Sequence, residues 1–417
     1  MNRSCPTLQR LALWLLCATG GIPAAAACQA KPGPAEPGAE LTVSVMTMGP
    51  GAMVWERFGH NAIWIHDPVQ GTDLTYNYGL FDFRQQNFIL RFARGQMWYW
   101  MAGFPAEQYL EEYRRNNRSV WVQELDLPPR ARLQLEQFLS WNALPENRFY
   151  HYDYYRDNCS TRVRDAIDRV AGGAVRRATE AVPVAASYRF HTQRLTANDP
   201  LIYTGLLLAL GERVDRPLTA WEEMFLPLKL REHLRSVTIA GPDGHPKPLV
   251  KSERTIFLST APSPPDAPPD WLPAYLLLGS TIGVLAWVLS RGARRSALAR
   301  AGFLLVVAGW AVLVGLAGTV LAGLWGLTDH VMAYRNENLL QMSPLALFML
   351  PFLFGAVRGS PGRGRAAFAV AAAVATLSAL GLAAKLLPGF EQVNGPVIAL
   401  ALPAHIGVAL GLRSLRS

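Results

Sequence analysis

Five long apolar stretches in the last third of the chain constrain its fold more than any other feature. They cover residues 271–289, 299–324, 343–357, 366–387 and 394–412. Most are long enough to cross the hydrocarbon core of a bilayer as a helix, and the short third one would borrow flanking residues. We therefore predict an all-α membrane domain of five spans over residues 271–417.

The arginines around these stretches predict the orientation of the spans. The two alternate loops, 325–342 and 388–393, hold only Arg335, and Lys385 lies at the edge of the helix before the second loop. The segments on the other side carry nine arginines: Arg291, Arg294, Arg295, Arg300, Arg358, Arg363, Arg365, Arg413 and Arg416. The positive-inside rule then places the C-terminus in the cytoplasm and both alternate loops outside it.

The formal net charge of +9 owes much to these arginine clusters. Clusters between apolar runs are a membrane pattern, and the chain has no recognised nucleic-acid motif. We therefore expect no nucleic-acid partner.

Residues 1–27 have the pattern of a secretory signal peptide. Arg3 and Arg10 give the positive start, "LALWLLCAT" the apolar centre and "AAAA" before Cys28 the cleavage site. The mature chain would begin with a flexible leader over residues 28–39. The N-terminal part would therefore be exported, which agrees with the orientation of the spans.

Two cysteines, Cys28 and Cys159, would remain after cleavage. A lipobox ending at Cys28 is an alternative that Ala25 disfavours, because a larger aliphatic residue is expected there. A disulfide between the two is disfavoured because a flexible leader holds disulfide geometry poorly.

The segment 40–260 is predicted to be a water-soluble domain of strands and helices. The expected strands are "LTVSVMTM", "NAIWIHD", "LTYNYGLFDF" and "SVWVQELDL". Helices are expected in "PRARLQLEQFLSWNAL", after Cys159 and in "WEEMFLPLKLREHL". The aromatic segment "MWYWMAGF" is interpreted as core or as a membrane-surface belt, with a lipid groove as the further alternative. A proline-rich linker, residues 261–270, would end the domain.

The segment "YYRDNCSTRVRDAIDRV" places Cys159 at the predicted start of a helix. Val163, Ile167 and Val170 recur at helical spacing, and Asn158 is a residue type that caps helices. Backbone N–H groups and the positive end of the helix dipole favour a thiolate there. Cys159 is therefore a candidate nucleophile.

A thiol nucleophile needs an imidazole base and a polar group that orients the ring. His60 in "WERFGHNAIWI" lies at the entrance to a strand, and Asn77 in "YNYGLFDF" lies on the next strand. By residue type alone, His66 and His151 are equally available as the base.

The motifs "WERFGHNAIWI", "YNYGLFDF", "YYRDNCSTRVRD" and "DRPLTAWEEMFLP" resemble the Lnb-type bacterial envelope family. The resemblance implies a periplasmic α+β domain, similar to permuted papain-like folds of the NlpC and lecithin:retinol acyltransferase kind, before an inner-membrane domain. It also implies Cys159 as nucleophile and His60 as base. Asn77 would be the third residue, with Asp73 and His66 as rivals.

By this resemblance the chain is a lipoprotein N-acyltransferase. It would move an acyl chain from a phospholipid, through a thioester on Cys159, to the α-amine of a diacylated lipoprotein cysteine. Three alternatives remain: a Cys–His peptidase or amidase of the cell wall, a thiol phospholipase, and a non-catalytic scaffold. No cofactor is implied, and no Cys–His cluster has the spacing of a zinc site.

Further candidates for substrate binding are polar residues near the thiol or outside the membrane. Asn158 and Arg162 lie within one helical turn of Cys159, with a solvated face as the alternative for Arg162. The outer loop "GLTDHVMAYRNENLLQMSP" offers four more: His330, Arg335, Asn336 and Asn338. Arg335 would be the natural partner of a phosphate, although this loop could equally cap two helices or support the soluble domain.

Overall fold

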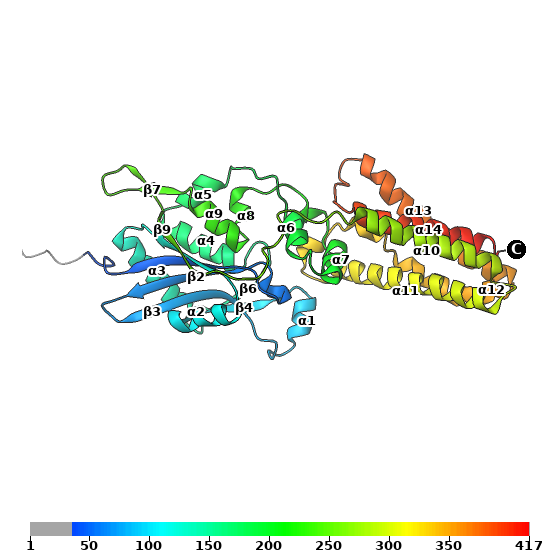
Figure 1. The fold of residues 1–417 in the computed structure, drawn as a ribbon, viewed down its shortest axis with the longest axis horizontal. Helices are drawn as coiled ribbons and strands as arrows, with labels where there is room; N and C mark the ends of the chain where they lie inside the picture. The colour runs from blue at the N-terminus through cyan, green and yellow to red at the C-terminus, as the bar shows by residue number, and fades with distance from the viewer. Residues whose placement is uncertain (1–35, 417) are drawn as a thin grey trace, which may run out of the picture. The chain divides into compact units, whose positions relative to one another are not determined.

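A computed structural model of the chain describes residues 36–416, of which 37–416 belong to one compact unit. The predicted signal peptide, Cys28 and most of the predicted leader lie outside the described residues. The N-terminal region is built on an antiparallel sheet of seven strands in the order β6-β4-β3-β2-β1-β5-β9 (Figure 1). Its strands are β1 Thr42–Met48, β2 His60–Asp67, β3 Thr72–Leu80, β4 Trp98–Pro105, β5 Val120–Leu125, β6 Phe149–His151 and β9 Val250–Phe257.

The other elements of this region are short helices and a small hairpin. The helices are η1 Val54–Glu56, α1 Phe88–Ala93, α2 Ala106–Arg115, α3 Pro129–Asn142, α4 Cys159–Val170, α5 Ala174–Thr179, α6 Tyr188–Leu195, α7 Pro200–Ala209, η2 Glu212–Val214, α8 Ala220–Glu223 and α9 Pro227–Leu234. The hairpin pairs β7 Thr238–Ala240 with β8 Pro246–Pro248.

Both faces of the sheet are covered, which explains why β1 is buried along nearly its whole length. Val43 and Val45 point into the core shared with α3, α4 and α9. Met46 and Met48 point to the other face, against α2. Side chains alternate between the faces of a strand, so an apolar run such as this one needs a helix on each side.

One sequence expectation in this region is confirmed and one is corrected. The aromatic segment 97–104 contributes to the core through Met97, Tyr99 and Met101, and from Trp98 onward it lies in β4. The helix expected over 221–234 is broken into α8 and α9. Pro227 is the first residue of α9, where its missing N–H and fixed φ are tolerated, whereas inside one continuous helix it would remove a hydrogen bond.

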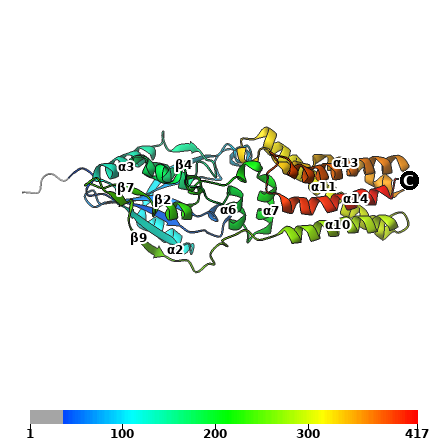
Figure 2. The same ribbon diagram turned by 90° about the horizontal axis from the view of Figure 1, so that it is seen from above.

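The C-terminal region contains five helical segments long and apolar enough to cross a membrane, as predicted. Their bounds are Leu272–Gly292, Ala297–Leu327, Glu337–Val357, Pro361–Leu386 and Gly395–Arg413. The third segment extends beyond 343–357 by including flanking 3-10 turns. Figures 1 and 2 show α10, α11, α13 and α14 running side by side.

The elements of this region are α10 Leu272–Gly292, α11 Ala297–Leu327, η3 Val331–Ala333, η4 Glu337–Leu340, η5 Pro344–Met349, α12 Leu350–Val357, α13 Pro361–Ala383, η6 Ala384–Leu386 and α14 Gly395–Arg413. No helix or strand lies between Phe257 and Leu272, where the proline-rich linker was predicted. The short helix α7 was missed in the sequence, and its Tyr203 and Leu207 pack into the core of the membrane helices.

Candidate functional site

Cys159 is the first residue of α4, and Asn158 caps that helix. The side-chain oxygen of Asn158 accepts hydrogen bonds from the backbone N–H groups of Ser160 and Thr161, at 2.9 and 3.0 Å. Its side-chain nitrogen donates to the carbonyls of Tyr154 and Phe225, both at 3.0 Å. Asn158 is thus buried and fully engaged by backbone groups, so its observed role is to fix the start of α4 rather than to face a substrate.

The thiol of Cys159 lies between α4 and the strands β2 and β3. Backbone N–H groups of Asn61, of Ser160 and of Cys159 itself are directed at the sulfur. On the β3 side stands Gly79, with a φ of +90°, where an added Cβ would lie 3.4 Å from the Cβ of Cys159. A glycine therefore allows the helix start to approach the strand closely.

His60 opens β2, one residue before the Asn61 N–H that faces the thiol. Its Nε2 lies 3.1 Å from Oδ1 of Asn77, and Tyr109 donates a second hydrogen bond to the same oxygen. The hydroxyl of Tyr113 lies 3.0 Å from that of Tyr109. Because an amide oxygen only accepts, Nε2 of His60 carries the proton and Nδ1 is left as the basic nitrogen.

The two rivals of Asn77 lie at the far end of the same strand pair. His66 and Asp73 face each other in the register of β2 and β3, with Nδ1 of His66 3.4 Å from Oδ1 of Asp73. Asn77 alone of the three contacts His60. His151, the other base considered, lies on the edge strand β6 against Trp98.

At rest the thiol and the imidazole are both neutral. Burial raises the pKa of Cys159 to about 11, although the backbone N–H groups and Arg118 oppose this. Burial, followed by the charge of Arg118, lowers the pKa of His60 to about 4. The thiolate expected at rest from the helix start is therefore corrected, because loss of solvent outweighs the helix terminus.

Arg118 is a charged residue near the site that the sequence reasoning missed. Its guanidinium donates to the carbonyl of Gly49 at 3.0 Å and pairs with Glu56 at 3.2 Å. It also lies over the ring of Tyr113, 4.7 Å from the centroid. A buried cation here favours any negative charge that forms on the sulfur or on a reacting carbonyl. Its sequence signal, an arginine before a strand, is too common to be specific.

Arg162 is held within the soluble domain. It forms an ion pair with Asp157 and lies over the ring of Tyr150, 4.2 Å from the centroid. The guanidinium is thereby fixed on the first turn of α4, and the carboxylate of Asp157 compensates its positive charge.

Asn336 and Asn338, two of the loop candidates, contact the soluble domain. Nδ2 of Asn336 donates to the carbonyls of Leu208 and Ala209, at 2.8 and 3.1 Å. Nδ2 of Asn338 donates to those of Leu207 and Leu208, both at 3.1 Å. These two residues therefore satisfy the last carbonyls of α7, which is a supporting role for the soluble domain.

The remaining two loop candidates also have protein partners. Nε2 of His330 lies 2.8 Å from the carbonyl of Phe92, next to α1. Arg335 has a φ of +54° and pairs with Glu212 at 3.2 Å, and its side chain is more than half exposed. Neither residue contacts Cys159 or His60 by a hydrogen bond, so the structure does not gather the six candidates into one site.

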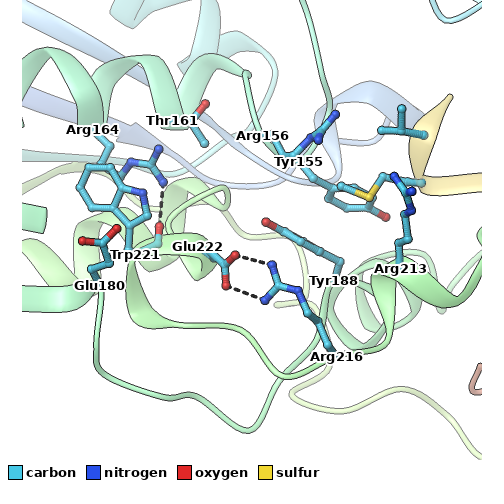
Figure 3. Close-up of a pocket in the computed structure, with 12 residues that line it drawn as sticks. Tyr155, Arg156, Thr161, Arg164, Glu180, Tyr188, Arg213, Arg216, Trp221 and Glu222 are labelled. Carbon is cyan, nitrogen blue, oxygen red and sulfur yellow. Dashed lines mark hydrogen bonds and ion pairs between the residues drawn. The ribbon is translucent and has the colours of Figure 1, made fainter. Parts of the chain in front are cut away.

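A pocket of about 590 Å³ is lined in part by residues of α4 (Figure 3). Thr161 and Arg164 contribute to it from α4, and Val331 and Met332 from the outer loop. Arg216 pairs with Glu222 within the lining, whereas Arg164 pairs with Asp165, which does not line the pocket. Neither Cys159 nor His60 lines it.

Among residues 36–416, no cluster of three or more histidine, cysteine, aspartate or glutamate side chains is arranged to hold a metal ion. The side chains that meet near the thiol are an imidazole, a carboxamide, two phenols and a guanidinium. This set can move a proton and stabilise an anion, which suits nucleophilic acyl chemistry.

The fold and the site define a class of protein: a multi-pass membrane protein whose extramembrane α+β domain carries a cysteine at the start of α4 and a histidine–asparagine pair on the adjoining strands β2 and β3. Residues 37–194 match the family model of the Lnb N-terminal periplasmic domain, and this part of the chain belongs to that family. The match contains Cys159, His60 and Asn77. The Lnb resemblance is thereby confirmed, as is an α+β domain followed by five apolar helical segments.

No curated protein and no solved structure was found to match the chain. The permuted papain-like arrangement stays a prediction for that reason. The periplasmic family and the five apolar segments make this a multi-pass protein of the inner membrane.

Proposed function

We propose that the protein is a lipoprotein N-acyltransferase that works through a thioester on Cys159. The observation that carries the proposal is the position of the thiol: it meets the N–H of Asn61, whose neighbour His60 is held by Asn77. The membership of residues 37–194 in the Lnb family supports the same reaction class.

In the first half-reaction the sulfur attacks the ester carbonyl of a phospholipid while Nδ1 of His60 takes the thiol proton. The tetrahedral intermediate carries its charge on the former carbonyl oxygen, within reach of the backbone N–H groups at the start of α4 and near the charge of Arg118. The ester C–O bond then breaks. His60 returns the proton to the leaving alkoxide, which yields a lysophospholipid and an acyl thioester.

In the second half-reaction the α-amine of a diacylated lipoprotein cysteine attacks the thioester. His60 removes a proton from the amine, the C–S bond breaks, and the sulfur leaves and regains a proton from His60. The products are an N-acylated lipoprotein and the free enzyme. The proposal needs no cofactor, because the thioester already stores the reactivity that amide formation requires.

A neutral thiol on Cys159 and a neutral imidazole on His60 in the free protein fit these two half-reactions. A thiol with a pKa near 11 is protected from solution electrophiles, and it becomes nucleophilic only when His60 removes its proton during attack. Asn77 keeps the imidazole in the tautomer whose Nδ1 is basic. Asn77 is therefore proposed as the third residue of the site, and Arg118 as an electrostatic contributor.

The test is intact-mass analysis of the full-length protein after incubation with phospholipid vesicles. We expect an added fatty-acyl mass that hydroxylamine removes, and no adduct on Cys159→Ser. A diacylated lipopeptide with a free amine should discharge the adduct and gain the same acyl mass. Discharge by water at the same rate without lipopeptide would indicate a phospholipase instead. Cleavage of a cell-wall peptide by protein that never forms the adduct would indicate the peptidase.

A further inference from the structure

Several apolar side chains of η1, of the turn after β3 and of α1 are exposed together outside the sheet. We call Trp55, Phe83, Ile89, Leu90 and Phe92 the exposed rim. Ring contacts join its parts: Trp55 to Phe83 with centroids 5.7 Å apart, and Phe83 to Phe88 of α1 at 5.1 Å. Figure 1 shows α1 standing clear of the strands. A contiguous apolar patch of this kind marks a surface that contacts something other than water.

The exposed rim is fastened to the outer end of a membrane helix. The backbone N–H of Asp329 donates to the carbonyl of Arg94 at 2.8 Å, and His330 contacts the carbonyl of Phe92 at 2.8 Å. Asp329 is two residues beyond Leu327, the last residue of α11. Since α11 crosses the membrane, these contacts hold α1 close to the boundary between hydrocarbon and headgroups.

The charge pattern around α1 is the one found in helices that lie in a membrane interface. Residues 83–94, "FRQQNFILRFAR", contain three arginines and no acidic residue, and only Arg84 among these arginines pairs with a carboxylate, that of the preceding Asp82. Apolar side chains flanked by arginines bind hydrocarbon and anionic headgroups together. This pattern favours a phospholipid surface over an acidic or neutral protein partner.

Aromatic rings continue inward from the rim to the thiol. Phe81 contacts Phe83 with centroids 5.2 Å apart and stacks on Tyr99 at 5.1 Å. Tyr99 stacks on Tyr152 at 4.3 Å. At Gly79, an added Cβ would meet both the ring of Tyr152, at 3.6 Å, and the Cβ of Cys159. Ring contacts therefore run without a break from the exposed rim to Tyr152, beside Cys159.

We infer that the exposed rim inserts into the outer leaflet of the inner membrane and contacts phospholipid acyl chains, which the aromatic rings lead toward Cys159. The assignment of the lipid as acyl donor rests on the proposed function. The lipid contact of the rim does not, and it can be measured without any turnover.

The first experiment places the photo-crosslinking residue p-benzoylphenylalanine at position 89 or, in a control, at position 69 of the full-length protein. Ile89 and Val69 are each 78% exposed, but Val69 lies in the turn between β2 and β3, at the end of these strands away from His60. After irradiation in phospholipid nanodiscs, mass spectrometry should find phospholipid adducts at position 89 and few or none at position 69. Equal lipid yields at both positions would overturn the inference, and so would a lack of lipid adducts at position 89. In native membranes, a protein adduct at position 89 in place of lipid would do the same.

The second experiment compares acyl-enzyme formation from vesicles by Ile89→Asp/Leu90→Asp and by Val69→Asp. We expect the first variant to lose about tenfold or more, because two aliphatic side chains no longer enter hydrocarbon. Val69→Asp should match the native protein, and melting temperatures of both variants will reveal any misfolding. Equal acylation by the two variants would overturn the inference. If the native protein gives lipid crosslinks at position 89 but forms no acyl-enzyme, the lipid contact of the rim stands and the proposed function is contradicted.

Discussion

At the scale of single residues, both reactive groups of the proposed site are neutral in the free protein. Burial raises the pKa of Cys159 and lowers that of His60, so that proton transfer between them is unfavourable in the free protein. Catalysis by such a pair depends on stabilising charge as it develops in the transition state. The backbone N–H groups beside the sulfur and the buried charge of Arg118 are the groups placed to do this.

The neutral imidazole gives a prediction about pH. The base must be unprotonated, so acylation should stay constant around neutral pH and fall only as pH drops through the His60 pKa of about 4. An ordinary histidine would give that loss near a pH of about 6.5. The rate of adduct formation by mass spectrometry, followed from pH 7 downward, checks this. Half-maximal activity near the ordinary value would show that the imidazole is solvated in the working enzyme.

The charge of Arg118 gives a second prediction at this scale. Arg118 lowers the pKa of both His60 and Cys159, so Arg118→Gln should raise both values. The acid limb of the acylation profile then moves to higher pH, and alkylation of Cys159 by iodoacetamide requires higher pH. Arg118→Lys keeps the charge and should shift both profiles less. Identical shifts in the two variants would mean that packing, not charge, is responsible.

At the scale of elements, the end of α7 is closed by the outer loop of the membrane region. Asn336 and Asn338 supply the hydrogen bonds that the last carbonyls of a helix lack within the helix itself. Gly211, just beyond α7, packs against the backbone of Tyr334 so closely that a side chain would collide. The soluble domain and the loop therefore form one structural unit in this part of the chain.

This junction predicts a large difference in stability between neighbouring loop residues. Asn338→Ala removes two hydrogen bonds to the buried carbonyls of Leu207 and Leu208 and should cost about 1–3 kcal/mol of folding free energy, although Arg189 and Asn336 still donate to these carbonyls. Arg335→Asn breaks an exposed ion pair and should cost at most about 1 kcal/mol, because asparagine tolerates a positive φ. Melting temperatures in detergent measure the difference. A loss of acylation in stable Arg335→Asn would instead favour the phosphate role considered for this residue.

At the scale of the whole molecule, one orientation satisfies both the charge rule and the contacts of the outer loop. The arginine pattern places loop 325–342 outside the cytoplasm. Independently, this loop hydrogen-bonds to α7 and α1 of a domain whose family is periplasmic. We therefore expect the C-terminus to lie in the cytoplasm.

Cysteine accessibility tests this topology in a background of Cys28→Ser and Cys159→Ser. A cysteine replacing Val393, between the fourth and fifth segments, should react with a membrane-impermeant maleimide in spheroplasts. One replacing Ser360, between the third and fourth, should react only after permeabilisation. Labelling of Ser360→Cys in intact spheroplasts would reverse the predicted orientation.

Local sequence patterns determined the membrane segments of this protein and the start of α4. An apolar run that crosses the bilayer core can form all of its backbone hydrogen bonds within itself only as a helix. The five segments could therefore be predicted from the sequence alone. The start of α4 was likewise predictable, because Asn158 and the helical spacing after Cys159 act within a few residues. The Lnb motifs added the pairing of Cys159 with His60, which no local rule supplies.

Only the tertiary structure decided the features that depend on distant residues or on burial. The strand register sets Asn77 near His60 and sends Asp73 and His66 to the other end, and one residue of slip would turn Asn77 to the opposite face. Burial reversed the expected ionisation of Cys159. Packing brought Arg118 to the site and made Asn336 and Asn338 supports of α7. The sequence alone thus determined the segments and the chemical type of the reactive groups, whereas their neighbours and charge state depend on solvent exclusion that no local pattern encodes.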